Sequence, residues 1–400
     1  MKIQIKPTFY FILFSIILII AIIDPQNSLG LRYPLLAVFL PIYIYNIFTT
    51  FSCFEKKYFI IILSYLLPIW GLIMYLFRGD LNFKLSDTSY ISFAILFSIV
   101  HILSKHKLII YFKKASIITG LFFSFLIIFN AYELIIIKSN VLTNFVIENE
   151  IARVSFRDYG GFEVPYVYYY SSTLLILPLS ILIESKFSWV SLILILIIST
   201  AFFLSGTRSH NILSFLFLIL FFKKSVSKKI FYVFLAIVCF SIAFSYSSDI
   251  LNLLESVFST KEESNNFKLS MLSKYITMFS DPITIFFGQG FQAVDWNNEL
   301  RSIVTEKATK TEWTYLELYR VFGFFLPTII FGYFIYFIFK KANPEDSYKK
   351  LILIALLFDS LLNPHIFSTY GAILMAAVFS TQYSSKSSEY GKAVLENHIK

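Results

Sequence analysis

The sequence predicts an all-α membrane protein with about twelve transmembrane helices. Of its 400 residues, 57% are hydrophobic, 19% are aromatic and only 15% are charged. Soluble globular domains carry roughly 25% charged residues, so the composition excludes that class. The apolar residues are gathered in long runs separated by short polar turns, which is the pattern of a chain that crosses a bilayer repeatedly.

The apolar runs define the predicted helices. A span needs about 20 residues, and the two pairs within 189–222 and 348–381 are short for that purpose. The first run follows Lys2 and Lys6 as a signal peptide would, but Asn27–Gly30 is a poor cleavage site, so we expect an uncleaved anchor. The runs lie at 9–23, 33–51, 58–77, 88–104, 115–137, 166–183, 189–204, 210–222, 230–248, 313–339, 348–362 and 365–381.

Lysine and arginine are expected on opposite sides of the membrane. With the N-terminus in the cytoplasm, the lysine clusters between the runs fall inside, which obeys the positive-inside rule and accounts for the net charge of +9 without nucleic acid. Every arginine then falls on or near the outer face. Arginine is the better bidentate partner for phosphate, so the segregation predicts anion recognition outside, with chance as the alternative. The arginines are Arg32, Arg78, Arg153, Arg157, Arg208, Arg301 and Arg320.

The turn after the run 189–204 combines several features of an anion site. Gly206 is a suitable C-cap for the first helix, and Thr207 or Ser209 is a suitable N-cap for the second. Arg208 would then lie at a helix N-terminus, where free N–H groups and the helix dipole favour phosphate. The alternative is an arginine that reaches the lipid headgroups from an ordinary turn.

The chain is expected to form one integral membrane domain, 1–400, with two long outer loops. The smaller outer loop, 138–165, carries Arg153, Arg157 and Tyr159 close to an acid and two glycines. We count these three residues as candidates for binding a phosphorylated or glycan substrate.

The larger outer loop, 249–312, is the only long extramembrane segment. Apolar residues recur at helical spacing in 250–258 and 269–279, which predicts two amphipathic helices that lie on the membrane or cover the bundle. A segment hinged by glycines, 286–291, follows them.

A charged stretch begins the run at 313–339. Glu312, Leu316 and Arg320 lie near one helix face, and Glu317 is spaced for an ion pair with Arg320. Charged side chains inside a span are costly unless they are paired or face a wet cavity, so they suggest function. A structural Glu317–Arg320 pair is the alternative for those two residues. Glu312, at the water boundary, is the better candidate base.

Two histidines are further candidates for substrate binding. His365 follows Asn363-Pro364 in a turn predicted to lie on the same side as Arg208, and His210 lies beside Arg208. A histidine in a turn is more often a solvated or capping residue. The tyrosines in 166–170 are expected in an interfacial aromatic belt, with sugar stacking as the alternative.

No cofactor or metal is expected. Cys53 and Cys239 lie in different runs without the spacing of metal ligands, and the sequence has no phosphate-binding loop of the Walker A type.

From roughly residue 150 onwards, about half of the chain resembles the superfamily of O-antigen polymerases (Wzy-type) and O-antigen ligases. The resemblance depends on the order and spacing of several motifs. These are the turn Leu204-Ser205-Gly206-Thr207-Arg208-Ser209, the late outer loop, Phe287-Gly288-Gln289-Gly290-Phe291, and Glu312-Trp313-Thr314-Tyr315-Leu316-Glu317-Leu318 followed by Phe322-Gly323.

The resemblance implies a fold similar to that of C-type glycosyltransferases, in the inner membrane of a bacterium with the site facing the periplasm. The expected reaction joins repeat units carried on undecaprenyl pyrophosphate into O-antigen or capsule, by inverting transfer. Arg208, Arg153 and Arg157 would stabilise the leaving pyrophosphate, and Glu312 would activate the acceptor hydroxyl. The expected partners are the lipid-linked glycan, membrane lipid and a chain-length regulator protein.

Several rival functions remain at this stage. Ligases of the superfamily show a His-Asn pair before the helix that begins here at Trp313, whereas this chain has Thr311-Glu312, which favours a polymerase. A flippase for lipid-linked oligosaccharides also suits twelve spans, but it needs polar groups near the midplane. A C-type mannosyltransferase usually has an acidic pair in its first outer loop, where this chain offers only Asp24.

Overall fold

The protein is mostly helical, which confirms the predicted class, and it adds one two-stranded sheet that the sequence did not predict. The structure is a computed structural model. It describes residues 7–25, 27–51, 62–78, 89–103, 109–137, 141–158, 163–185, 187–225, 263–291, 313–340, 347–361, 363 and 365–379. The predicted run 230–248 and the predicted helix 250–258 lie outside these residues.

The helices of the first third follow the apolar runs closely. Their regular α segments are continued by π-helical turns at two places. The elements are α1 (Pro7–Ile23), α2 (Arg32–Phe51), η2 (Ile62–Leu66), α4 (Leu67–Arg78), α5 (Ser89–Leu103), α6 (Ile109–Tyr132), η4 (Glu133–Ile137) and α7 (Val141–Glu148).

The rest of the described chain begins with a β hairpin and is otherwise helical. The elements are β1 (Ala152–Asp158), β2 (Glu163–Tyr169), η5 (Ser172–Leu175), α8 (Ile176–Glu184), α9 (Trp189–Leu204), α10 (Arg208–Ser225), α13 (Glu263–Met278), α14 (Pro282–Phe287), α15 (Thr314–Phe322), α16 (Phe325–Phe339), α17 (Ser347–Asp359) and α18 (Thr369–Phe379).

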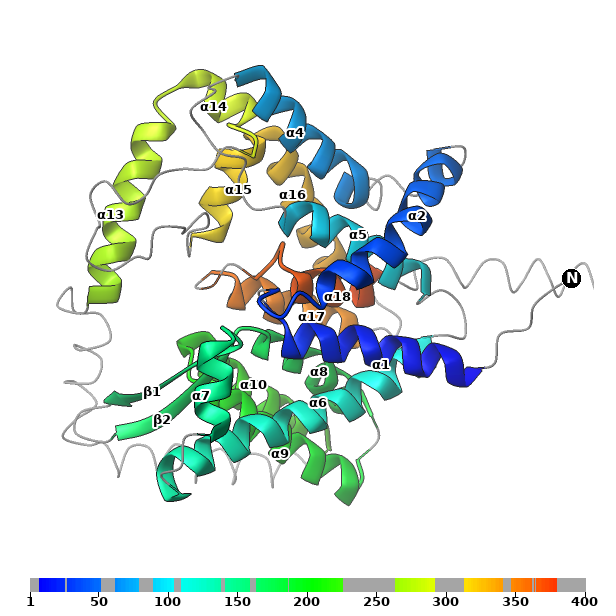
Figure 1. Cartoon of the computed structure of the whole chain (residues 1–400), viewed down its shortest axis with the longest axis vertical. Helices are drawn as coiled ribbons and strands as arrows, with labels where there is room; N and C mark the ends of the chain where they lie inside the picture. Colours follow the sequence, from blue (N-terminus) through cyan, green and yellow to red (C-terminus); the bar gives the residue numbers. More distant parts are fainter. Residues whose placement is uncertain are drawn as a thin grey trace, which may run out of the picture.

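The helix α18 is the centre of the molecule. Every one of its side chains is buried, and it packs against α5 and α17. In Figure 1, α6, α8, α9, α10 and the hairpin lie on one side of it, and α4, α14, α15 and α16 lie on the other. These two groups of elements therefore lie on opposite sides of α18, and the first group is continuous in sequence whereas the second combines α4 with late helices.

Two of the predicted spans are not single continuous helices. The run 166–183 begins as strand β2, because alternating valine and tyrosine residues favour a strand that pairs with β1. The run 313–339 is divided into α15 and α16 at Gly323, whose φ of 72° ends the first helix. Both runs were predicted from hydropathy, which does not register a break of one or two residues.

The structure does not establish twelve spans. Among the described residues, one helix, Ile109–Ile135, is long and apolar enough to cross a membrane by length and composition. Seven further apolar helices have 10–17 residues, short of the roughly 20 that a typical bilayer requires.

The segment around α14 is attached to the bundle mainly through main-chain hydrogen bonds. The amides of Gln289 and Gly290 donate to the carbonyls of Arg320 and Val321, at 2.6 and 3.0 Å. The amide of Phe291 donates to the carbonyl of Gly71 in α4 at 3.1 Å. This segment of the loop 249–312 is thus fixed to both α15 and α4.

The N-cap of α14 adds a polar attachment. Asp281 accepts hydrogen bonds from Thr284 and pairs with Arg78 at the end of α4. These hydrogen bonds, that of Thr284 first, lower the pKa of the Asp281 carboxyl to about 2. The carboxylate is therefore charged at neutral pH, when it both caps α14 and pairs with Arg78.

Two helical glycines provide a matched test of the packing. A Cβ at Gly120 in α6 would lie 2.6 Å from Cγ of Pro178 in α8, whereas a Cβ at Gly332 in α16 would meet nothing within 4 Å. We expect Gly120→Ala to lower the free energy of unfolding by about 1–3 kcal/mol through overpacking. Gly332→Ala should be neutral or stabilising, because alanine favours helix. Thermal unfolding in detergent measures both, and equal midpoints would contradict the crossing of α6 and α8.

Candidate functional site

The turn between α9 and α10 has the predicted capping geometry. Gly206 has a φ of 73° and follows the last residue of α9 and its cap, Ser205. The hydroxyl of Thr207 accepts a hydrogen bond from the amide of His210 at 3.2 Å, so Thr207 is the N-cap of α10. The main chain of Arg208 therefore begins α10, as predicted. Its side chain lies outside the described residues.

The turn between α17 and α18 meets this first turn through Asp359. Asp359 is the last residue of α17 and is fully buried. Its Oδ1 accepts hydrogen bonds from the hydroxyl of Ser209 at 2.7 Å and from Nδ2 of Asn363 at 3.1 Å. Its Oδ2 accepts one from the hydroxyl of Thr173 at 2.8 Å. One carboxylate thus joins α10, η5 and the α17–α18 turn.

Both candidate histidines lie beside this carboxylate. Nε2 of His210 is 3.2 Å from Asp359 Oδ1, and Nε2 of His365 is 3.8 Å from Oδ2. His210 is 0% exposed and His365 1%. The predicted alternative of solvated turn histidines was therefore wrong for both. Asp359, His210 and His365 are called the Asp359 cluster below.

Hydrogen-bond partners determine which nitrogen of His210 carries hydrogen. The hydroxyl of Ser205 donates to the carbonyl of Phe202 at 2.6 Å, so its oxygen accepts from Nδ1–H of His210 at 2.7 Å. Nε2 of His210 then faces two oxygens, Asp359 Oδ1 and Thr173 Oγ1 at 3.4 Å, and the latter already donates its own hydrogen to Asp359. In this tautomer Nε2 of His210 carries a lone pair directed at the Asp359 carboxylate.

His365 has weaker polar contacts. Its Nδ1 is buried and has no hydrogen-bond partner among the described residues. Its Nε2 is 3.3 Å from the hydroxyl of Tyr168 in β2. The ring is fixed mainly by packing, with its centre 5.0 Å from that of Tyr370.

The β hairpin covers the cluster with one row of residues. Arg153 pairs with Tyr168 and Ser155 pairs with Tyr166 in the antiparallel register, so the four belong to one face. On that face the ring of Tyr168 contacts the Asp359 cluster, and Tyr166 packs so closely on Gly206 that a Cβ there would be 2.4 Å from its ring. Nε of Arg153 donates to the hydroxyl of Tyr170 at 2.9 Å.

The remaining predicted residues are placed as follows. The backbone of Arg157 continues the row of Arg153 and Ser155 in β1, opposite Val164, and its side chain is not described. Tyr159 and Glu312 lie outside the described residues. The structure therefore brings His210 and His365 together beside the beginning of α10, with Arg153 opposite Tyr168 in the hairpin, and it does not place Glu312.

Arg320 has the geometry of the structural alternative. Its Nε and Nη2 donate to Glu317 at 2.8 and 2.5 Å, and its Nη1 donates to Gln289 at 3.1 Å. The hydroxyl of Tyr275 in α13 donates to the same glutamate at 2.7 Å. Arg320 is only 1% exposed, so its charge is used within the protein to join α15, α13 and the α14 segment.

Sequence reasoning missed Asp359 and Thr173. Asp359 carried a usable signal, because an acid near the end of an apolar run is costly unless it has a partner. Thr173 carried none, since a hydroxyl in an apolar run is common. Tyr168 was considered for sugar stacking but was expected in an aromatic belt at the start of a helix, whereas it lies in strand β2.

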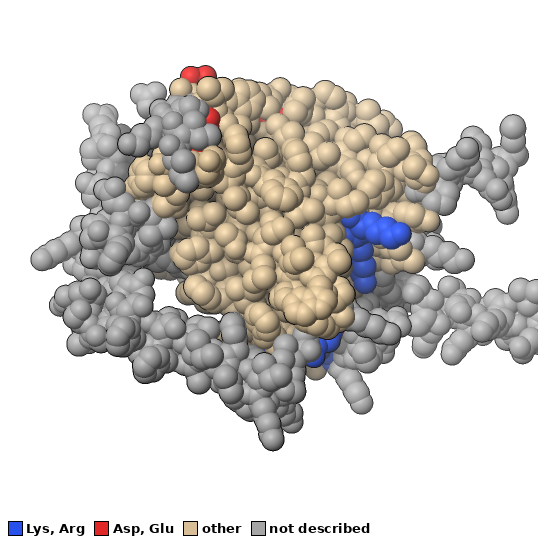
Figure 2. All heavy atoms as spheres, turned by 90° about the horizontal axis from the view of Figure 1, so that it is seen from below, with Lys and Arg blue, Asp and Glu red and all other residues tan. Residues whose placement is uncertain are grey.

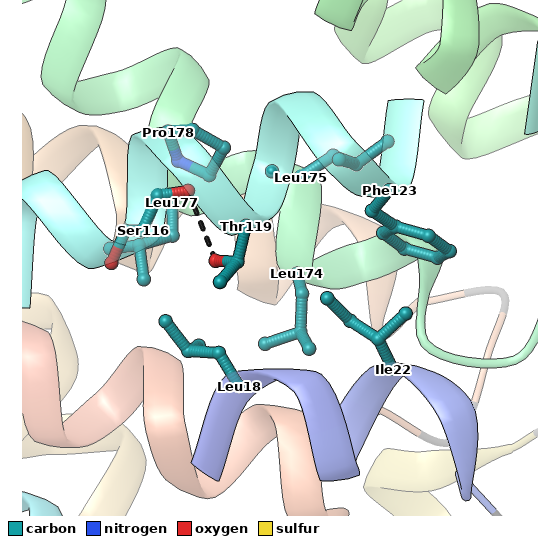
Figure 3. A pocket seen from close by; sticks show the side chains of 10 residues that line it. Leu18, Ile22, Ser116, Thr119, Phe123, Leu174, Leu175, Leu177 and Pro178 are labelled. Atoms are coloured by element: carbon teal, nitrogen blue, oxygen red, sulfur yellow. Dashed lines mark hydrogen bonds between the residues drawn. The ribbon is translucent and has the colours of Figure 1, made fainter. Parts of the chain in front are cut away.

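A separate hollow near α1, α6 and α8 carries no comparable chemistry (Figure 3). Its two hydroxyl groups, those of Ser116 and Thr119, donate to main-chain carbonyls of their own helix. It is otherwise apolar, lined by Leu18, Ile22, Gly120, Phe123, Leu174, Leu175, Leu177 and Pro178.

Comparison of the sequence with family models gives no match, and comparison with curated proteins gives no significant match.

Two adjacent buried residues test the importance of the carboxylate. Asp359→Ala removes the acceptor of three hydrogen bonds and the carboxylate beside His210, so we expect the free energy of unfolding to fall by about 3–5 kcal/mol. Ser360→Ala removes a buried hydroxyl that has no partner among the described residues and should be close to neutral. Unfolding midpoints in detergent measure the difference, and similar midpoints would refute the central place of Asp359.

Proposed function

We propose that the protein is an integral membrane glycosyltransferase that joins lipid-pyrophosphate-linked oligosaccharide units into a surface polysaccharide, by inverting transfer on the periplasmic face of a bacterial inner membrane. The observation that carries the proposal is the hairpin row. Its Tyr166 packs against Gly206, in the turn before Arg208 begins α10. Arg153 and Tyr168 belong to the same row. Arginine, a helix N-terminus and aromatic rings are the groups that bind a sugar pyrophosphate.

The outward side chains of the helices support a membrane location. Large apolar side chains are exposed on α1, α4, α6, α9 and α16, among them Phe9, Leu76, Phe125, Trp189 and Phe339, which are 51%, 74%, 54%, 73% and 83% exposed. Figure 2 shows a described surface with lysine and arginine at its edge and very few charged residues elsewhere on that face. Such an apolar surface is suited to contact with membrane lipid.

The ends of α17 support the predicted separation of lysine from the site. At its first turn, Nζ of Lys113 lies 4.0 Å above the ring of Tyr348. Asp359 is its last residue, 11 residues beyond Tyr348. Arg32, at the start of α2, donates to the hydroxyl of Thr369 at 2.7 Å, on the side of the α17–α18 turn. Lys113 and Arg32 thus lie toward opposite ends of this helix.

In the proposed reaction, the hydroxyl oxygen of the acceptor sugar attacks the anomeric carbon of the donor. The bond from that carbon to the pyrophosphate oxygen breaks, and the hydroxyl proton passes to a base. The free amides of α10 and the guanidinium of Arg208 would stabilise the charge that develops on the pyrophosphate, with Arg153 and Arg157 from the hairpin. Glu312 is the proposed base, and the loop 249–312 would cover the site.

The Asp359 cluster has a positioning role in this proposal. Ser209 and His210 are the second and third residues of α10, and both contact Asp359. The carboxylate therefore fixes the orientation of the turn that presents Arg208.

The arginine variants test the proposal. In a strain whose own polymerase gene is deleted, Arg208→Ala should collapse the ladder of chain lengths on a gel to single units, because losing one charge-stabilising donor costs roughly 10²–10³ in rate. Arg208→Lys should restore the ladder only partly, since lysine cannot bind phosphate in a bidentate manner.

The control is Lys224→Ala. Lys224 pairs with Glu184 near the C-terminal ends of α10 and α8, far from the turn that begins α10. Its loss should therefore leave the ladder unchanged. Full ladders from well-expressed Arg208→Ala and Glu312→Gln proteins would eliminate the proposed function.

A further inference from the structure

The Asp359 cluster has the composition of a transition-metal site. One ligand atom from each of His210, Asp359 and His365 can be chosen so that all three lie within 4.8 Å of one another. All three residues are buried. Two imidazoles and one carboxylate match Zn²⁺ better than Mg²⁺ or Ca²⁺, which prefer ligand sets made of oxygen alone.

The separations fit a cation between the residues better than direct contact. Charge-assisted N–H···O hydrogen bonds have lengths of about 2.7–2.9 Å. Tetrahedral Zn²⁺ with bonds of about 2.0–2.1 Å holds its ligand atoms about 3.3 Å apart. Nε2 of His210 lies 3.2 Å from Oδ1 of Asp359 and Nε2 of His365 lies 3.8 Å from Oδ2, so both separations are longer than a charge-assisted hydrogen bond and within about 0.5 Å of the spacing around a metal.

The hydrogen-bond pattern leaves one coordinating position on each residue. Ser205 holds His210 as the tautomer with hydrogen on Nδ1, which is the usual arrangement around a metal-bound histidine, and directs the Nε2 position to Asp359. Oδ1 of Asp359 has two hydrogen-bond donors from Ser209 and Asn363, whereas Oδ2 has one, from Thr173. A lone pair of Oδ2 therefore remains on the side of His365.

His365 gives an independent indication. It is 1% exposed, its Nδ1 has no partner among the described residues, and the oxygens beside its Nε2 are 3.3 and 3.8 Å away. Burying an imidazole without a strong hydrogen bond is unfavourable. A metal–nitrogen bond would offset that cost.

We infer that His210, Asp359 and His365 bind one divalent transition-metal ion, with Zn²⁺ the best match, and that this ion joins the α9–α10 turn to the α17–α18 turn. All three residues are buried, and three protein ligands leave the fourth position of a tetrahedral ion to water or another group. The inference does not depend on the proposed glycosyl transfer.

The test uses the full chain in detergent, purified with a tag that contains no histidine and without chelator. Elemental analysis should find about one Zn²⁺ per wild-type chain. His365→Gln and Asp359→Asn should reduce the bound metal about tenfold or more. Glu133→Gln, which alters a buried carboxylate that caps α7, is the matched control and should keep its metal.

A second measurement covers variants that fail to fold. A strong chelator should lower the unfolding midpoint of the wild-type protein, and Zn²⁺ should restore it. Co²⁺ added to chelated wild type should give the visible absorption of a nitrogen and oxygen ligand set. Wild-type protein that holds no metal after equilibration with Zn²⁺ and shows no shift of its midpoint would overturn the inference. So would full metal content in folded His365→Gln.

Discussion

The buried carboxylate of Asp359 is the interaction on which the candidate site depends. It accepts hydrogen bonds from Thr173, Ser209 and Asn363, which belong to three segments distant in sequence. A buried charge is tolerated only when such partners are all in place, so the two helix turns and η5 can fold into one arrangement only. The contacts of Ser209 and His210 with Asp359 also fix the first turn of α10, which contains the main chain of Arg208.

The sequence predicted the helices well where hydropathy alone decides. The bounds of α1, α9 and α17 lie within a few residues of the apolar runs, and the cap at Thr207 follows from residue type and position. Hydropathy failed where local geometry decides. A single glycine, Gly323, ends α15, and tyrosine and valine alternation before η5 makes a strand. The number of spans also exceeded what the lengths of the described helices support.

The candidate site could be predicted only in part. His210 and His365 were selected as residues near Arg208 in the predicted topology, and the structure does bring them together. The acid Asp359 near the end of an apolar run was itself a signal, but its partner Ser209, 150 residues away, has no local signal in the sequence. For Arg320, the i,i+3 spacing to Glu317 correctly indicated an ion pair, yet spacing does not reveal that Tyr275 and Gln289 complete it.

The attachment of the α14 segment has a consequence for how this surface can diversify. Its contacts to α15 and α4 run largely from amide to carbonyl, through Gln289, Gly290 and Phe291. Apart from Gly290, where no Cβ fits, these hydrogen bonds do not involve the side chains of α14 itself. The outward residues of α14, such as Ile283 and Phe286, which are 56% and 48% exposed, can therefore be exchanged while the segment stays in register. Related chains can therefore change the side chains of this surface while the main-chain hydrogen bonds of 289–291 stay the same, as variable loops do on a constant framework.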